Sequence, residues 1–222
     1  MQVSHEYNTT IAIKNMRTHT KETQEGLTPE HALDILKEGN GRFVNNIKTH
    51  RNLLEQVNET KSGQFPFAAI LSCIDSRTSA ELIFDQGLGD VFSIRIAGNI
   101  LNDDILGSME FACKIAGSKL IVVLGHTKCG AIEGACDHIE LGHITTLLNK
   151  VKPAIEIEKE TTSDRNSKNK KFVENVTVNN VNLTVQKVKE QSPLLREMEQ
   201  SGKIKIIGGL YDLETGIVRF YE

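Results

Sequence analysis

The sequence lacks any apolar run near the length of about 20 residues that a membrane-spanning helix needs, so we expect no membrane segment. It also lacks a strong excess of charge, because 26 basic and 29 acidic residues leave a formal net charge of −3. That balance provides neither the basic footprint of a nucleic-acid-binding protein nor a polybasic membrane patch. Residues 1–25 are polar and contain no signal-peptide core. We therefore expect a cytoplasmic protein without a nucleic-acid partner, although a leader cleaved from a longer precursor would be compatible with these residues.

Cysteine is scarce, and its pattern gives no sign of a disulfide-stapled fold. Four cysteines in 222 residues do not indicate a disulfide framework in a chain of this size. Cys113 and Cys136 fall in apolar or small-residue helical patterns, so we expect both in the core. A chain of this length can bury a substantial core. We expect a polar amino-terminal arm over residues 1–26 and a single catalytic domain over residues 27–222, with no internal repeat.

Apolar runs alternate with helical patterns along the chain, and this alternation predicts an α/β fold. Short apolar runs bounded by turn residues are typical of buried parallel strands. We expect four of them, over residues 67–72, 91–94, 119–125 and 203–210. A turn then returns the chain as an antiparallel edge strand over residues 217–221. The predicted fold is a parallel-rich mixed β-sheet, with four parallel strands plus an antiparallel C-terminal edge strand, flanked by helices.

Helices are expected between the strands, where apolar residues recur at helical spacing. Asp103 and Asp104 are expected to cap a helix that ends at Gly117. Pro153 is expected to weaken or kink a helix over residues 144–158. Further helices are expected over residues 29–45, 78–85, 173–188 and 193–202 and after residue 130, with a mobile loop over residues 158–171.

Two short segments carry side chains with metal-binding chemistry. Cys-Ile-Asp-Ser-Arg at 73–77 and His-Thr-Lys-Cys-Gly at 126–130 each follow an expected buried strand. Two thiolates, an imidazole and a carboxylate are ligands that Zn²⁺ prefers. Ligands of open α/β sheets bind beyond the carboxyl ends of strands, so the fold could bring the two segments together. Two cysteines and one histidine would leave one coordination position open, as in catalytic zinc sites.

Each of these residues has a simpler interpretation when it is taken alone. Cys73 could be a buried apolar cysteine at a strand end. The spacing of His126 and Cys129 is by itself a weak signal, and Asp75 with Arg77 could form an ordinary surface ion pair. Their common position at two strand ends favours a zinc site.

The chain resembles the β-class carbonic anhydrases in four segments, which occur in the order and spacing of that family. They lie at residues 73–77, 95–99, 125–131 and 208–216. The resemblance covers roughly residues 28–222. It implies one Zn²⁺ per chain, held by Cys73, His126 and Cys129. It also implies the reversible hydration of carbon dioxide to bicarbonate and a proton by zinc-bound hydroxide.

The resemblance assigns roles to further residues around the metal. Asp75 could orient the hydroxide, or it could become the fourth ligand in a closed state, with Arg77 holding its carboxylate through a bidentate fork. Gln64 matches a glutamine that binds substrate, and Phe92 matches an apolar wall residue. Without the resemblance, these two would be a loop residue and a strand core residue. Gly130 is expected to let the backbone approach the metal loop closely.

The resemblance also bears on assembly and on a second site. It implies a homodimer or larger homo-oligomer, in which the arm at residues 1–26 wraps a neighbouring subunit and Gln64 and Phe92 reach a pocket at the subunit boundary. One subgroup of the family builds a non-catalytic bicarbonate site around a tryptophan, and this position is Ile70 here. Arg95 and Tyr211 stand at other positions of that site. We expect no such site in this chain.

Two other functions are compatible with the same residues. A hydrolase of carbonyl sulfide or carbon disulfide would use identical zinc chemistry and differ in its pocket. A non-catalytic, zinc-stabilised binding module would use the metal for folding alone. Asp75 and Arg77 argue against the second possibility, because a structural site is expected to recruit a fixed fourth protein ligand.

Overall fold

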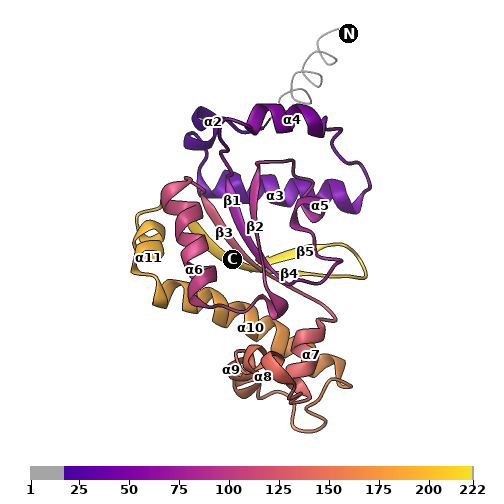
Figure 1. The fold of residues 1–222 in the computed structure, drawn as a ribbon. Helices are drawn as coiled ribbons and strands as arrows, with labels where there is room; N and C mark the ends of the chain where they lie inside the picture. Colours follow the sequence, from indigo (N-terminus) through magenta and orange to yellow (C-terminus); the bar gives the residue numbers. More distant parts are fainter. Residues whose placement is uncertain (1–17, 222) are drawn as a thin grey trace.

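A five-stranded sheet in the order β2-β1-β3-β4-β5 forms the centre of the molecule (Figure 1). The computed structural model describes residues 18–221, so residues 1–17 of the expected arm lie outside the described part. β1 pairs in parallel with β2 and β3, β3 pairs in parallel with β4, and β5 runs antiparallel to β4. The predicted mixed sheet is therefore confirmed. The strands are β1 Ala68–Ser72, β2 Val91–Arg95, β3 Leu120–His126, β4 Lys205–Tyr211 and β5 Val218–Tyr221.

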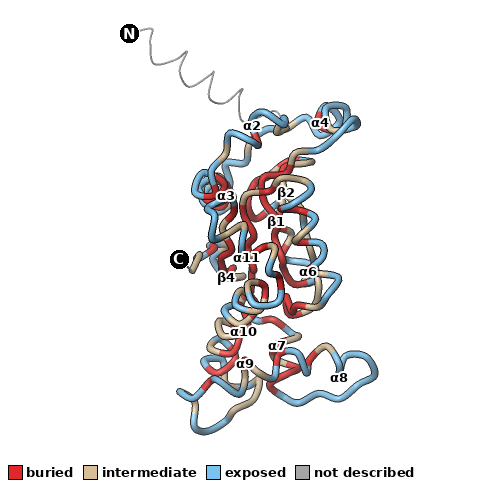
Figure 2. Tube along the Cα trace, turned by 90° about the vertical axis from the view of Figure 1, so that its left-hand side faces the viewer, coloured by how far each residue is buried: buried red, intermediate tan, exposed pale blue. Residues whose placement is uncertain are grey.

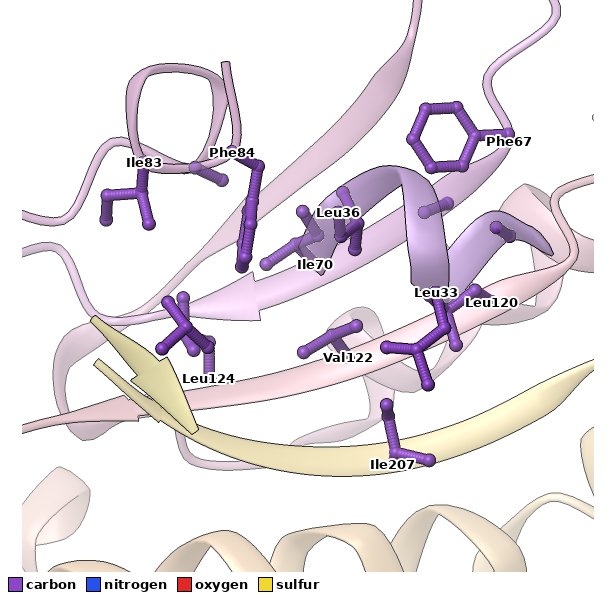
Figure 3. Close-up of a cluster of buried hydrophobic side chains, with 14 of the residues drawn as sticks. Leu33, Leu36, Phe67, Ile70, Ile83, Phe84, Leu120, Val122, Leu124 and Ile207 are labelled. Atoms are coloured by element: carbon purple, nitrogen blue, oxygen red, sulfur yellow. The ribbon is translucent and has the colours of Figure 1, made fainter. Parts of the chain in front are cut away.

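Helices cover both faces of the sheet, which is why its central strands are apolar throughout. Every residue of β1 and β3 is buried. On one face, Leu36 of α3 (Pro29–Val44) and Ile83 of α5 (Ala80–Ile83) pack with Ile70 and Val122 of the sheet (Figure 3). The opposite face is covered by α6 (Asp103–Glu110), α10 (Lys170–Gln191) and α11 (Pro193–Gln200). Figure 2 shows the buried residues following the sheet, with exposed residues on the outer sides of the helices.

The long helix α10 packs against the sheet where two glycines leave room for it. A Cβ atom at Gly125 of β3 would lie 2.6 Å from Cγ2 of Val181, and one at Gly208 of β4 would lie 2.7 Å from Cγ1 of the same valine. Neither distance is possible without movement of the helix or the strands. The two glycines therefore set the depth at which α10 sits, and with it the position of the residues next to Val181.

Three short helices, α7 (Gly130–Cys136), α8 (Gly142–Leu148) and α9 (Lys152–Ile157), gather at the carboxyl end of the strands. They lie opposite α2 (Lys21–Glu25) and α4 (Leu53–Thr60) (Figure 1). The prediction of one helix over residues 144–158 is wrong, because turn residues 149–151 separate α8 from α9. Pro153 lies in the first turn of α9, where a helix tolerates proline because that N–H has no partner within the helix.

Other local predictions need correction at helix ends. The side chain that caps α6 is Asn102, which accepts from the Ile105 N–H at 2.9 Å, and not Asp103 or Asp104. The helix continues into a π-helical turn at Phe111–Ile115 before it ends near Gly117. Within residues 18–221, the sequence analysis did not predict α2 and α4.

The segments before and after the core are tied down by buried polar side chains. Gln24 of α2 is buried and donates to the carbonyls of Pro66 and Ala116 at 2.7 and 2.8 Å, so residues 18–26 pack on the domain. Glu158 is buried at the start of the expected loop, where it pairs with Arg165 and accepts from Thr161. Among residues 18–221, no helix combines the length and apolarity needed to cross a bilayer.

Candidate metal centre

Cys73, His126 and Cys129 converge at the carboxyl end of the sheet. Cys73 directly follows β1, His126 is the last residue of β3, and Cys129 is the residue that precedes α7. Because β1 and β3 are neighbouring parallel strands, their ends lie side by side. The two sulfurs are 3.9 Å apart, and the donor atoms of all three residues lie within 4.8 Å of one another. All three side chains are buried.

The imidazole of His126 is oriented as a metal ligand. Its Nδ1 lies 2.9 Å from the Thr127 carbonyl oxygen, which is the contact that an Nδ1–H donor makes. That bond leaves the lone pair on Nε2 free to bind a metal. Nε2 is buried and has no hydrogen-bond partner among the described residues. A buried polar atom without a partner is costly, and a metal ion at this position would satisfy it.

The spacing of the sulfurs fits zinc. Zn–S bonds of about 2.3 Å in a tetrahedron place two sulfurs about 3.8 Å apart, and the observed separation of Cys73 and Cys129 is 3.9 Å. The contact with the Cys129 thiol lowers the pKa of Cys73 to about 4. The same contact, together with burial, raises the pKa of Cys129. The two cysteines therefore share one proton between their sulfurs, and a bound cation could replace this proton. The three residues thus fit a zinc ion.

Asp75 and Arg77 form a bidentate pair beside the cluster. Arg77 donates from Nε to one carboxylate oxygen at 2.9 Å and from Nη2 to the other at 2.7 Å. The backbone N–H of Arg77 donates to the same carboxylate at 2.9 Å. These bonds from Arg77 hold the pKa of Asp75 well below its usual range, so the side chain is ionised. The Asp75 carboxylate is not one of the donors grouped within 4.8 Å, which leaves the three-residue set open.

The loop that carries Cys73 and Asp75 is held by Arg95, which the resemblance marked only as one position of the non-catalytic bicarbonate site. Arg95, at the end of β2, donates from Nε to the Cys73 carbonyl at 3.1 Å and from Nη2 to the Asp75 carbonyl at 2.6 Å. The Thr78 hydroxyl contacts the same two carbonyl oxygens at 3.1 and 2.9 Å. The strand register, which pairs Ser72 with Arg95, puts the guanidinium beside this loop. Register is not readable from the sequence alone.

The residues expected around a substrate lie apart from the three donors. Gln64 is exposed and precedes β1, whose five residues span about 16 Å before Cys73, so it lies toward the other end of that strand. Phe92 is half-buried in β2 and makes an edge contact with Phe111, with ring centroids 6.5 Å apart. A Cβ at Gly130 would meet nothing within 4 Å. The expected role of Gly130 in a close backbone approach at the metal loop therefore stays a prediction.

A cleft of about 530 Å³ borders the site on one side. Its lining includes Arg77, Thr127 and Lys128, but none of the three donor residues. Lys128 forms an ion pair at 2.7 Å with Glu214, which lies in the turn between β4 and β5. The cleft therefore reaches Arg77 but does not contact the three donor residues.

Comparison with known proteins identifies the family. The family model for carbonic anhydrase matches residues 68–218. Carbonic anhydrase 2 of Mycobacterium tuberculosis is 34% identical over 194 residues, which cover 85% of this chain and 90% of that protein. The β-carbonic anhydrase CafA of Aspergillus fumigatus has a similar fold, with a TM-score of 0.66 at 24% identity over 87% of this chain and 90% of that one. A tetrameric β-carbonic anhydrase of Sordaria macrospora gives a TM-score of 0.66 at 22% identity over 86% and 95% of the two chains.

Proposed function

The chain belongs to the β class of the carbonic anhydrase family, and on this premise we propose that it binds one zinc ion and catalyses the reversible hydration of carbon dioxide to bicarbonate and a proton. One observation carries the proposal: three buried donors, Cys73, His126 and Cys129, lie within 4.8 Å of one another, and the Nε2 atom of the histidine has no other partner among residues 18–221. The separation of the sulfurs agrees with tetrahedral zinc.

The protein residues around the cluster have separate tasks. Cys73, His126 and Cys129 would hold the zinc, which when bound supplies a Lewis acid that lowers the pKa of a water in the open coordination position. Asp75 is kept ionised by Arg77, so it can accept a hydrogen bond from the attacking group and hold it in one orientation. Arg95 and Thr78 fix the backbone from which Asp75 projects. A dithiolate site acidifies water less than a site with three neutral histidines, so the rate of hydration should rise as the pH increases above neutral.

The experiment compares Cys129→Ala with a matched cysteine variant. Cys136→Ala removes another buried thiol from the same apolar cluster near α7, but Cys136 is not one of the donors. We expect Cys129→Ala to lose zinc by elemental analysis and carbon dioxide hydration by stopped-flow assay, while Cys136→Ala keeps both. Full zinc content and activity in Cys129→Ala would refute the ligand set. Zinc bound by the wild-type chain without any hydration would point to a zinc-stabilised binding module, and faster turnover of carbonyl sulfide or carbon disulfide would reassign the substrate.

We also propose that the active unit is at least a homodimer, with Gln64 and Phe92 of one chain contributing to the pocket of the other. Gln64 lies toward the opposite end of β1 from Cys73, so it can serve a metal centre only in a neighbouring subunit. The described chain also exposes large apolar side chains on α4 and on the π-helical turn after α6, including Leu54 at 77% and Ile115 at 71%. Such surface is typical of an interface between subunits. Sedimentation and activity measured over one dilution series test the proposal, and a fully active species of monomer mass would contradict it.

A further inference from the structure

We propose that Asn180 of α10 is a positioning residue for the metal centre, because it holds the Gly98 peptide whose N–H donates to the sulfur of Cys73. The inference deepens the proposed function and rests on it for the identity of the metal. It concerns a residue that lies far along the chain from the donors and that no motif of the sequence marks.

The contact is a relay of two hydrogen bonds through the backbone. Asn180 donates from Nδ2 to the Gly98 carbonyl oxygen at 2.9 Å. The backbone N–H of Gly98 in turn donates to Sγ of Cys73 at 3.3 Å. Asn180 is only 4% exposed, so its amide group is withheld from water and depends on this partner. The helix side chain is thus connected to a zinc ligand by one residue of backbone.

Gly98 needs an external hold because its own conformation is permissive. It has φ +67° and is followed by Asn99 with φ +43°, so two successive residues lie in the left-handed region. Glycine reaches many other conformations at similar cost, and most of them would turn its N–H away from Cys73. A bond from the Asn99 N–H to the Ile96 carbonyl at 3.0 Å closes the turn. Asn180 fixes the carbonyl on the other side of Gly98.

Position 98 does not accept a residue larger than glycine. A Cβ atom there would lie 3.3 Å from Cβ of Ala131, which is tighter than ordinary packing, and an L-residue would be strained at its positive φ. The loop therefore combines a glycine that the fold requires with an amide that limits its freedom. Val181, the residue after Asn180, packs closely against the sheet at Gly125 and Gly208, and this packing fixes the position from which the Asn180 amide projects.

The hydrogen bond to sulfur matters for metal binding in two ways. An N–H donor aimed at a thiolate stabilises the charged form of the ligand, and it orients the sulfur toward the metal. Groups that bond directly to a metal ligand typically change metal affinity or activity by about 10- to 100-fold when they are removed. Asn180 acts through the Gly98 peptide, so we expect an effect at the lower end of that range, about 10-fold. Loss of the Asn180 bond should therefore loosen Cys73 without removing any ligand.

The test compares Asn180→Ala with Asn179→Ala. Asn179 is the preceding residue of the same helix and donates from Nδ2 to the Ala154 carbonyl at 3.3 Å, a contact outside the metal site. Both variants lose one amide-to-carbonyl hydrogen bond from α10. Two measurements report on the metal centre without using catalysis: the rate of zinc transfer to excess chelator, and the sulfur-to-cobalt charge-transfer band of Co²⁺-loaded protein.

We expect Asn180→Ala to release zinc about 10-fold faster than the wild type and to shift the cobalt band, while Asn179→Ala leaves both unchanged. Wild-type release and an unshifted band in Asn180→Ala would overturn the proposal, and so would equal changes in both variants, which would indicate general loosening of the helix. If Asn180→Ala does not fold, Asn180→Leu, which keeps a similar side-chain volume but has no hydrogen-bond donor, carries the same comparison. A wild-type chain that binds zinc but does not hydrate carbon dioxide would refute the proposed function and leave this inference standing.

Discussion

The close packing of α10 against Gly125 of β3 leads to a prediction about the substitution Gly125→Ala. The new Cβ would lie 2.6 Å from Cγ2 of Val181 and 3.4 Å from Cγ2 of Thr177. Ordinary carbon–carbon contacts are about 3.5–4.0 Å, so the first distance is about 1 Å too short. Both neighbours are on α10, and Gly125 precedes His126, one of the three clustered donor residues. The helix must move away from β3 at the point where it carries Asn180.

The expected cost follows from the size of this overlap. Overpacking a filled core by one methyl group costs about 1–3 kcal/mol, which for a chain of this length lowers the midpoint of thermal unfolding by about 2–12 °C. Val181→Ala removes both methyl groups of the valine and costs about 1.6 kcal/mol in lost burial alone. It also removes the atom that clashes. The double variant should therefore be more stable than the sum of the single changes predicts, by about 0.5–3 kcal/mol.

Thermal unfolding of metal-free protein measures this coupling, and zinc release to a chelator measures its effect on the site. Gly107→Ala is the matched control, because a Cβ at this helical glycine of α6 meets nothing within 4 Å. That change should raise stability by about 0.4–1 kcal/mol. Independent, additive effects of Gly125→Ala and Val181→Ala would show that the two residues do not limit each other and would refute the reasoning.

Three further predictions concern charge and reactivity. Arg165→Met should cost about 1.5–3 kcal/mol at neutral pH, because it removes a charged donor from the Glu158 carboxylate, which keeps its bonds from Thr161 and Asn175. Burial opposes ionisation of Glu158, but hydrogen bonds from Asn175 and Thr161 lower its pKa overall. The difference in unfolding free energy between wild type and variant should therefore be present above the unfolded pKa of about 4.3 and shrink as the pH falls through the folded pKa. Chemical denaturation at a series of pH values measures this difference. Burial raises the pKa of Cys113 and of Cys136 to about 12, so alkylation of zinc-loaded native protein at pH 8 should label neither, and mass spectrometry that finds either one labelled would contradict this. Inhibition by bicarbonate should follow a simple hyperbola, because Ile70 is wholly buried and the Arg95 guanidinium bonds to the loop at Cys73; a steep, pH-coupled curve that disappears on mutation of Tyr211 would show that a second anion site exists.

The general plan of the fold was predictable because its causes are local. The five strands occur within two residues of their expected bounds, since a short run of apolar residues between turn signals leaves little choice of structure. The donor residues were predictable for a similar reason. Cys73, His126 and Cys129 are chemically distinct, and each lies at or just after the end of a run that must be a buried strand.

Where local signals were weak or competed, the predictions failed. Helix α4 has exposed apolar residues such as Leu54 and buries Gln56, so its pattern does not look like that of a core helix. The break between α8 and α9 contains Val151, which is completely buried in an apolar cluster, so the apolar pattern does not mark the interruption.

The sequence by itself determined the strands, the parallel sheet and the chemistry of the donors, because these follow from residue type and short-range periodicity. Tertiary structure alone decided which distant side chains support that chemistry. Asn180 reaches Gly98 across 82 positions of the chain, and Arg95 reaches the Asp75 carbonyl across 20. Such contacts depend on strand register and on how deeply a helix sits, which are set by the packing of the whole core and leave no periodic trace in the residues themselves.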